Sequence, residues 1–223
     1  MNFDPDPLCP FRRRRKEARP SELLDAALEL FVDKGFASTR SEEVARRAGV
    51  SKGTLYLYFP SKEELLKAVI QRFLADPIAS SAQEADTADG PTPEVMENLL
   101  SDWWMRIYDS PASGVFKLII SEARNFPDIA QFYAEQVIVP GTALCVRLLH
   151  RGIERGEFRA IDIDAAAHSI LMPLVLLCVH KHSLEPCGIS KSLGLDPEGF
   201  IRAHLRLILQ GLLVRSAPAG AAA

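Results

Sequence analysis

Apolar side chains recur every three or four residues along most of this chain, which is the period of an amphipathic α-helix. The stripe is clearest over residues 24–31, 65–73 and 96–107. No run alternates with period two for long enough to predict a sheet, so we expect an all-α fold. With 223 residues, of which 48% are hydrophobic, the chain can bury a sizeable core.

Residues 41–62 contain two short helical patterns joined by a tight turn. Gly49 follows the first pattern, at the position where a left-handed residue commonly ends a helix. Ser51 is the expected N-cap of the second helix, which would bury Leu55 and Phe59 one turn apart. This arrangement is a helix-turn-helix, which holds one helix in a DNA groove.

The outward side of the second helix, over residues 52–59, carries small, hydroxyl-bearing and cationic side chains. Such groups can approach phosphates and base edges closely. The set comprises Lys52, Gly53, Thr54, Tyr56 and Tyr58, and Leu57 could touch a thymine methyl. On composition alone, a tyrosine-rich helix is more often a core or interface helix, so the DNA interpretation rests on the spacing of the whole motif.

Capping and basic residues flank the motif. Ser61 begins a capping box for the next helix. Lys62 lies at that helix's N-terminus, where the peptide dipoles favour an anion, so we expect it to contact a phosphate. Upstream is a basic run that is expected to be a solvated, disordered arm in the free protein. A basic arm beside such a motif can neutralise phosphates or enter a minor groove, and here it comprises Arg12, Arg13, Arg14 and Arg15.

Charge is divided unevenly along the chain. The whole chain has a net charge of -3, which taken alone argues against a nucleic-acid partner. Residues 11–75, however, carry 14 basic and 9 acidic side chains, whereas residues 76–223 carry 12 basic and 18 acidic ones. The basic part coincides with the helix-turn-helix, where contact with phosphates would need it.

The motif and its flanks resemble the DNA-binding domain of the TetR family of bacterial transcriptional regulators. The resemblance runs without a gap over residues 24–73 and includes ALELFVDKGF, VARRAGVSKGTLYLYF and SKEELL. Arg40 departs from the family, which more often has a serine or threonine cap there, so Thr39 or Ser41 is expected to cap the first helix of the motif. The resemblance implies operator contacts, mostly to phosphates, from Ser41, Ser51, Lys52, Thr54, Tyr56, Tyr58 and Lys62.

Together these features divide the chain into four parts. Residues 1–18 are expected to be a flexible basic arm, 19–75 the helix-turn-helix DNA-binding domain, 76–215 an effector-binding and dimerisation domain, and 216–223 a flexible tail. Residues 79–93 are small, polar and acidic, so they are expected to form a mobile loop or linker. In TetR-like proteins the last two long helices form a four-helix interface, which implies a homodimer on a palindromic, double-stranded DNA operator.

Prolines and caps mark the C-terminal helices. Pro140 should kink or break its helix, because proline lacks a backbone donor and clashes with the preceding turn. Residues 165–182 are apolar on almost every side, as in a helix buried between neighbours or subunits, and Pro173 interrupts them. The apolar run 170–179 is only 10 residues, too short to cross a bilayer, so no membrane partner is expected. Asp196 is the expected N-cap of the last helix.

Aromatic and flexible residues of the C-terminal part predict a mainly hydrophobic effector cavity. Ordinary core packing is the alternative for any single one of them. The set is Trp103, Trp104, Tyr108, Phe116, Phe126, Phe132, Tyr133 and Met172, with Glu122, Gln136 and His168 as groups that could orient a ligand. Residues 121–133 also resemble a branch of the family that is often linked to control of efflux genes.

Patterns for catalysis and metal binding are missing from the sequence. His180 and His182 would point to different faces of a helix, and the four cysteines show no Cys-x-x-Cys spacing, so no metal or cofactor is expected. Reduced thiols and no signal peptide suggest the cytoplasm. We therefore expect a dimeric repressor that a small hydrophobic effector releases from DNA; the alternative is a helical binding protein or enzyme in which the motif is structural.

Overall fold

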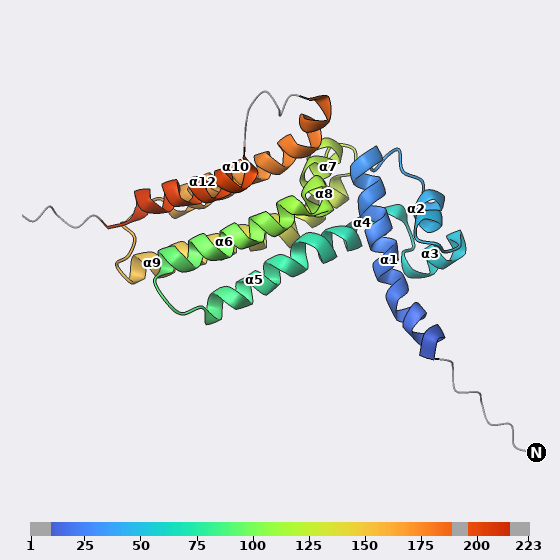
Figure 1. Ribbon diagram of the computed structural model, residues 1–223, viewed down its shortest axis with the longest axis horizontal. Helices are drawn as coiled ribbons and strands as arrows, with labels where there is room; N and C mark the ends of the chain where they lie inside the picture. The colour runs from blue at the N-terminus through green and yellow to red at the C-terminus, as the bar shows by residue number, and fades with distance from the viewer. Residues whose placement is uncertain (1–9, 189–195, 215–223) are drawn as a thin grey trace, which may run out of the picture. The chain divides into compact units, whose positions relative to one another are not determined.

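The computed structural model describes residues 10–188 and 196–214, with side chains from Arg19 onward. Within that part of the chain the fold is all-α, as predicted, and its β content is one isolated bridge between Phe158 and Leu213. The chain forms two compact units, Met1–Ile70 and Gln71–Ala223 (Figure 1). The boundary therefore lies five residues before the one expected from the sequence.

The described part of the first unit contains four helices, which a small apolar core joins. They are α1 (Pro10–Lys34), α2 (Ser41–Arg47), α3 (Lys52–Tyr58) and α4 (Lys62–Ile70). Helix α1 packs on α2 and α4. Phe31 and Phe36 are fully buried and meet edge to face with ring centroids 5.3 Å apart. Gly35 lies between them with φ of 86°, a conformation that lets α1 end and the chain turn back without a steric penalty.

Helix α1 begins earlier than the sequence predicted. Its backbone is helical from Pro10, so residues 10–18 extend a helix where a flexible arm was expected. Pro20, expected near the helix start, therefore lies inside α1. The side chains of the four predicted arm arginines lie outside the described residues, as do residues 1–9 of the arm and the predicted tail 216–223.

The second unit is a bundle of longer helices. Its α-helices are α5 (Asp76–Thr87), α6 (Thr92–Asp109), α7 (Gly114–Glu122), α8 (Pro127–Tyr133), α9 (Val139–Glu154), α10 (Ile163–Ser183) and α12 (Pro197–Leu212). Short 3-10 turns occur at η2 (Pro111–Ser113) and η4 (Glu185–Cys187). Helix α6 packs on α9 and α12, and α10 packs on α7, α9 and α12 (Figure 1). Asp196 caps α12 as predicted, because its carboxylate accepts a hydrogen bond from the Gly199 amide.

The expected linker over residues 79–93 is mostly helix, so that prediction is wrong. Helix α5 continues to Thr87 and buries Ile78, Ser81 and Ala85, which are spaced as one helical stripe. The small residues that suggested a loop allow α5 to lie close to its neighbours. Its C-terminal end is held by Arg151 of α9, whose guanidinium donates hydrogen bonds to the carbonyls of Ala85 at 3.2 Å and Ala88 at 2.8 Å. Tertiary contacts thus order a segment whose composition resembles a linker.

Two π-helical turns accommodate prolines in the second unit. The turn η3 (Ala134–Ile138) directly precedes α9, in which Pro140 occupies the first turn. The turn η1 (Gln71–Ala75) precedes α5 and Pro77 in the same way. A π turn widens the backbone where the proline ring would clash with the carbonyl of the preceding turn, so the chain stays helical through Pro140 and does not break there.

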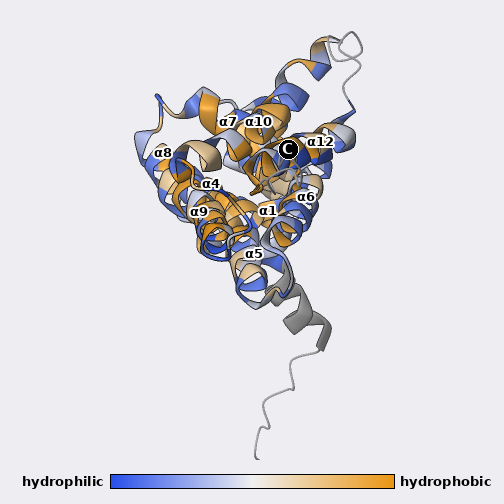
Figure 2. Cartoon of the chain, turned by 90° about the vertical axis from the view of Figure 1, so that its left-hand side faces the viewer, coloured by the Kyte–Doolittle hydropathy of each residue, from blue (hydrophilic) through white to orange (hydrophobic). Residues whose placement is uncertain are grey.

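Two stretches of the second unit are long and apolar enough to cross a bilayer by length and composition alone. They are Pro127–Glu154 and Ile163–Cys187, with mean hydropathies of 1.2 and 1.7, and the sequence predicted no such segment. Helices of soluble bundles pass the same test, and both stretches pack against other helices here. Only 28% of each apolar window is buried, so both helices leave apolar surface exposed, and α10 is apolar over much of its length (Figure 2).

Candidate nucleic-acid interface and internal cavity

The turn between α2 and α3 has the geometry that the sequence predicted. Gly49 adopts φ of 67°, and the amide of Val50 donates to the Ala45 carbonyl at 2.9 Å, which closes the turn. Ser51 caps α3 by accepting a hydrogen bond from the Thr54 amide at 3.1 Å. Leu55 is fully buried and fixes α3 on α2, whereas Phe59, the second expected anchor, is only partly buried.

The outer face of α3 exposes residues that the fold itself does not use. Leu57 is 78% exposed and Tyr56 is 40% exposed, although both are large apolar groups. A Cβ on Gly53 would meet only the Ser51 hydroxyl, at 3.8 Å, so the protein's own packing does not require glycine there. Lys52 is exposed as well, whereas Thr54 and Tyr58 are partly buried. The helix therefore presents a face suited to close approach by another molecule.

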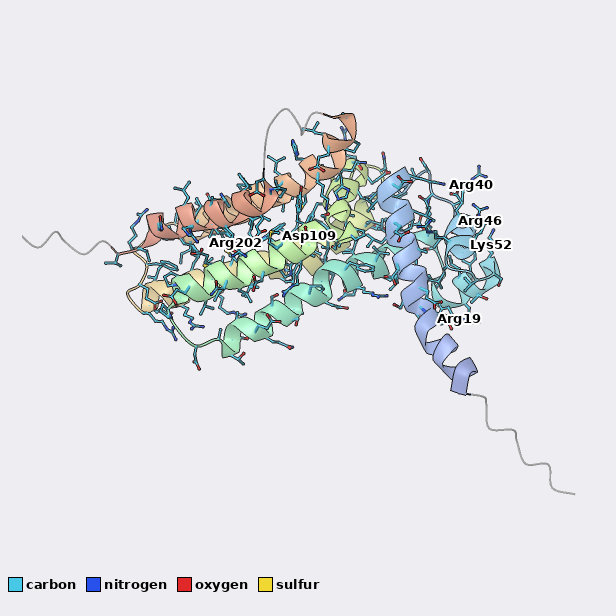
Figure 3. All side chains as sticks on the ribbon, viewed as in Figure 1. Arg19, Arg40, Arg46, Lys52, Asp109 and Arg202 are labelled. Carbon is cyan, nitrogen blue, oxygen red and sulfur yellow. The ribbon has the colours of Figure 1, made fainter. Side chains whose placement is uncertain are left out.

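Basic side chains surround this face, and some are already paired. Lys52 forms an ion pair with Glu42, and the hydrogen bond from Lys52 lowers the pKa of that carboxyl. Arg40 and Arg46 are exposed and form no ion pair with a carboxylate among the described residues. Both lie on the α2–α3 side of the unit with Lys52 (Figure 3). Sequence reasoning treated Arg40 only as a departure from the family and overlooked Arg46, although both guanidiniums are available to phosphates.

Lys62 is engaged inside the unit. Its ammonium donates to the carbonyls of Phe36 at 2.8 Å and Thr39 at 3.1 Å, and lies 4.4 Å from the centre of the Phe36 ring. These contacts tie the start of α4 to the loop between α1 and α2. In this conformation Lys62 holds two parts of the unit together, whereas the sequence predicted that it would contact a phosphate.

The start of α2 also differs from the expectation. Neither Thr39 nor Ser41 caps it: the Thr39 hydroxyl donates to the Gly35 carbonyl at 2.8 Å, and Ser41 is the first helical residue and only 7% exposed. Arg40 occupies the cap position, and its backbone amide donates to the Glu43 carboxylate at 3.2 Å. A carboxylate reaching back from the third helical position thus replaces the missing serine or threonine.

The second unit contains a half-open cavity of about 330 Å³, which is lined by residues of α5, α6, α7, α8, η3, α9 and α10. Trp104 forms one wall, stacking on Phe116 at 5.7 Å and meeting Trp103 edge to face at 4.8 Å. The lining comprises Ile78, Ser81, Leu99, Leu100, Trp103, Trp104, Phe116, Ile120, Tyr133, Val137, Ile138, Gly141, Thr142, Leu144, His168, Leu171, Met172 and Val175.

The lining includes part of the set predicted from the sequence. Trp103, Trp104, Phe116, Tyr133, His168 and Met172 line the cavity, whereas Glu122, Phe126, Phe132 and Gln136 do not. Tyr108 also lies outside it and donates a hydrogen bond to the Glu185 carboxylate at 3.2 Å. Sequence reasoning missed Ile78 and Ser81, because they belong to the helix that resembled a linker.

Comparison with known proteins identifies both units. Residues 23–69 match the family described as bacterial regulatory proteins, tetR family, and residues 94–181 match the C-terminal domain described as AefR-like transcriptional repressor. The chain belongs to the TetR family of transcriptional regulators. The first unit is therefore a TetR DNA-binding domain, and the family is not enzymatic.

Individual relatives support the same assignment. The repressor KstR2 of Mycolicibacterium smegmatis is 28% identical over 161 residues, which cover 70% of this chain and 76% of the relative. Among solved structures, FadR of Bacillus halodurans has a TM-score of 0.71 at 22% identity and covers 88% of this chain and 97% of its own. FadR of Bacillus subtilis, solved with stearoyl-CoA, has a TM-score of 0.65 at 18% identity, with coverages of 86% and 98%. These structures share the fold.

Among the residues that the structure describes, no group of three or more histidine, cysteine or acidic side chains could hold a metal ion. Cys145 and Cys178 are buried thiols, and burial raises the pKa of each to about 12. Both therefore remain protonated and unreactive at neutral pH.

Proposed function

We propose that this protein is a dimeric repressor that leaves a palindromic operator when a small hydrophobic effector occupies its cavity. The observation that carries the proposal is the half-open, apolar-lined cavity of about 330 Å³, which lies wholly in the second unit. A ligand that binds one conformation of that unit more tightly than another shifts the population of the DNA-binding form.

DNA recognition is assigned to the outer face of α3. Lys52, Gly53 and Tyr56 would approach the backbone and base edges, and Leu57 would meet a thymine methyl. Exchanging the Lys52–Glu42 ion pair for a phosphate costs little, because both side chains are exposed and solvent screens their attraction. The remaining contacts proposed from the family pattern are Ser41, Ser51, Thr54, Tyr58 and the arginine run Arg12, Arg13, Arg14 and Arg15, and we add Arg40 and Arg46. Lys62 belongs to the same pattern, but its ammonium already donates to the Phe36 and Thr39 carbonyls, so we assign it to holding the loop before α2.

A homodimer through α10 and α12 fits the exposed apolar side chains of these helices. Met172 and Leu176 of α10 are 63% and 66% exposed, and Leu207 of α12 is 72% exposed. Helices α10 and α12 pack on each other, so both can contribute to one self-complementary interface. A two-fold dimer would place two recognition helices on a palindromic operator in the cytoplasm.

The effector role is supported by the cavity and by relatives. FadR of Bacillus subtilis was solved with stearoyl-CoA, so a protein of this fold binds an acyl chain. For this chain, the described lining is apolar apart from a few uncharged polar groups and His168. Burying an apolar ligand there would contribute about 25 cal/mol for each Å² of apolar surface removed from water.

A fluorescence anisotropy titration with DNA from upstream of the protein's own gene tests the DNA assignment. We expect Tyr56→Ala and Arg46→Ala to weaken binding, and Arg46→Ala also to reduce the salt dependence by about one phosphate contact. Arg124→Ala is the matched control, because Arg124 is an exposed arginine that lies outside the helix-turn-helix and outside the proposed dimer helices α10 and α12. If both variants fold and bind as tightly as the parent, the assignment fails.

A further inference from the structure

The cavity is lined without a formal charge. Among the described residues, its lining contains no lysine, arginine, aspartate or glutamate, and His168 is the single side chain there that could become cationic. The Nδ1 atom of His168 lies 2.7 Å from the Asp164 carbonyl and donates to it, which leaves Nε2 as an acceptor in the neutral ring. A carboxylate or phosphate inside the cavity would lose its hydration without gaining a fixed partner.

The rim of the cavity is apolar as well. Ile120 and Ile138 line the cavity and are 62% and 49% exposed, so these side chains reach solvent at its edge. A ligand that extends past the rim therefore meets alkyl groups before it reaches water. The volume of about 330 Å³ lies at the lower end for small-molecule pockets, which favours a compact ligand over one with a large polar carrier group.

Two hydroxyls of the lining have no hydrogen-bond partner within the part of the chain that the structure describes. Ser81 on α5 is 2% exposed, and its hydroxyl has no hydrogen-bond partner among the described residues. The Tyr133 hydroxyl on α8 likewise has none. Burial raises the pKa of Tyr133, so its hydroxyl keeps its proton at neutral pH. Buried hydroxyls are normally bonded, so an unpartnered one that lines a cavity indicates a ligand or a water as its partner.

We propose that the effector is an uncharged, mainly aliphatic or aromatic compound whose hydroxyl or carbonyl group bonds to Ser81 and Tyr133. This inference rests on the proposed function and narrows it, because it excludes acyl-CoA thioesters and free fatty acids as the ligands that fit best. A hydroxyl or carbonyl oxygen can accept from both protein hydroxyls without bringing a charge into the apolar lining.

Three ligands that share one alkyl chain test the proposal on the full chain: 1-decanol, decanoate and decanoyl-CoA. Their affinities are measured near neutral pH by calorimetry and by the rise of the thermal midpoint. We expect 1-decanol to bind, and decanoate and decanoyl-CoA to bind more than about ten-fold more weakly, because each brings an unpaired charge. If either charged compound binds as well as 1-decanol, or if 1-decanol does not bind, the proposal is overturned.

Two neighbouring serines on α5 test whether the Ser81 hydroxyl contacts the ligand, because replacing either one removes the same group from the same helix. Ser81→Ala should weaken 1-decanol binding about five-fold, the value of one neutral hydrogen bond. Ser80→Ala should leave it unchanged, since Ser80 is exposed and pairs weakly with Glu84. Equal affinities in both variants would contradict the contact. DNA binding by the ligand-free parent protein is measured in parallel. If the parent protein does not bind DNA, the proposed function is refuted. If it binds DNA but prefers decanoate or decanoyl-CoA to 1-decanol, only this inference is refuted.

Discussion

Replacing Arg151 by methionine tests whether α9 holds α5 in place. Methionine keeps the apolar stem of the side chain and removes the guanidinium, which donates to two carbonyls at the end of α5 and, over a longer 3.4 Å, to the Gly90 carbonyl. A hydrogen bond from a charged donor contributes about 1.5–3 kcal/mol, and partial exposure favours the lower value, so the two bonds together contribute about 3 kcal/mol. The Nε proton of Arg151 is buried without a partner among the described residues, so its removal recovers about 1 kcal/mol.

The expected net loss is therefore about 2 kcal/mol of unfolding free energy. For a domain of about 150 residues this lowers the thermal midpoint by about 4–8 °C, which calorimetry resolves easily. Amide hydrogen exchange should locate the effect, because the backbone of α5 near Ala85 should lose protection while α12 keeps it.

Arg155→Met is the matched control for this prediction. Arg155 is exposed and donates to the Gly90 carbonyl at 2.9 Å, outside α5, so its removal should cost less than about 0.5 kcal/mol. The reasoning would be refuted if the two variants lowered the midpoint equally, because α5 would then be held by its buried stripe alone.

Four further substitutions give separate readouts. Leu57→Ala should leave the thermal midpoint unchanged, because this side chain is 78% exposed, and should weaken operator binding in the anisotropy assay. Gly53→Ala should fold normally, because a Cβ there would meet only the Ser51 hydroxyl at 3.8 Å, but should bind DNA more weakly, because the added methyl would stand between α3 and the proposed DNA contact. Lys62→Met should lower the unfolding free energy by about 1–3 kcal/mol in urea titrations, because three carbonyls lose their donor. Burial lowers the pKa of His182, so folding stability should fall as pH drops below ~6.5, and His182→Gln should flatten that dependence in midpoints measured against pH.

Sequence alone predicted the recognition motif because its signals are local. Gly49 must adopt a positive φ and Ser51 must offer an oxygen to the start of α3, and both requirements are met within a few residues of the chain. Helix α5 has no such signal. Its alanines and serines are compatible with loop or helix, and the contacts that decide between them come from Arg151, more than sixty residues away.

The cavity was predicted in part for a similar reason. Helical spacing places Tyr108 one turn after Trp104, so the pattern assigned both to one lining. The cavity ends between them. The Tyr108 hydroxyl donates a hydrogen bond to Glu185, and the Lys181 ammonium lies over the Tyr108 ring, so Tyr108 contacts polar groups outside the cavity. Periodicity identifies which side of a helix is buried, but the partner on that side depends on residues far away in the chain.

Lys62 has two possible roles that experiment can separate: a phosphate contact, or hydrogen bonds that hold the first unit together. Its position at the start of α4 suits an anion, yet its ammonium already has three carbonyl acceptors and an aromatic face. Moving it to a phosphate would leave those carbonyls without their donor, which costs more than releasing Lys52 from its exposed ion pair. Phosphate binding should therefore fall mainly to Lys52, Arg40 and Arg46, while Lys62 fixes the loop that precedes α2.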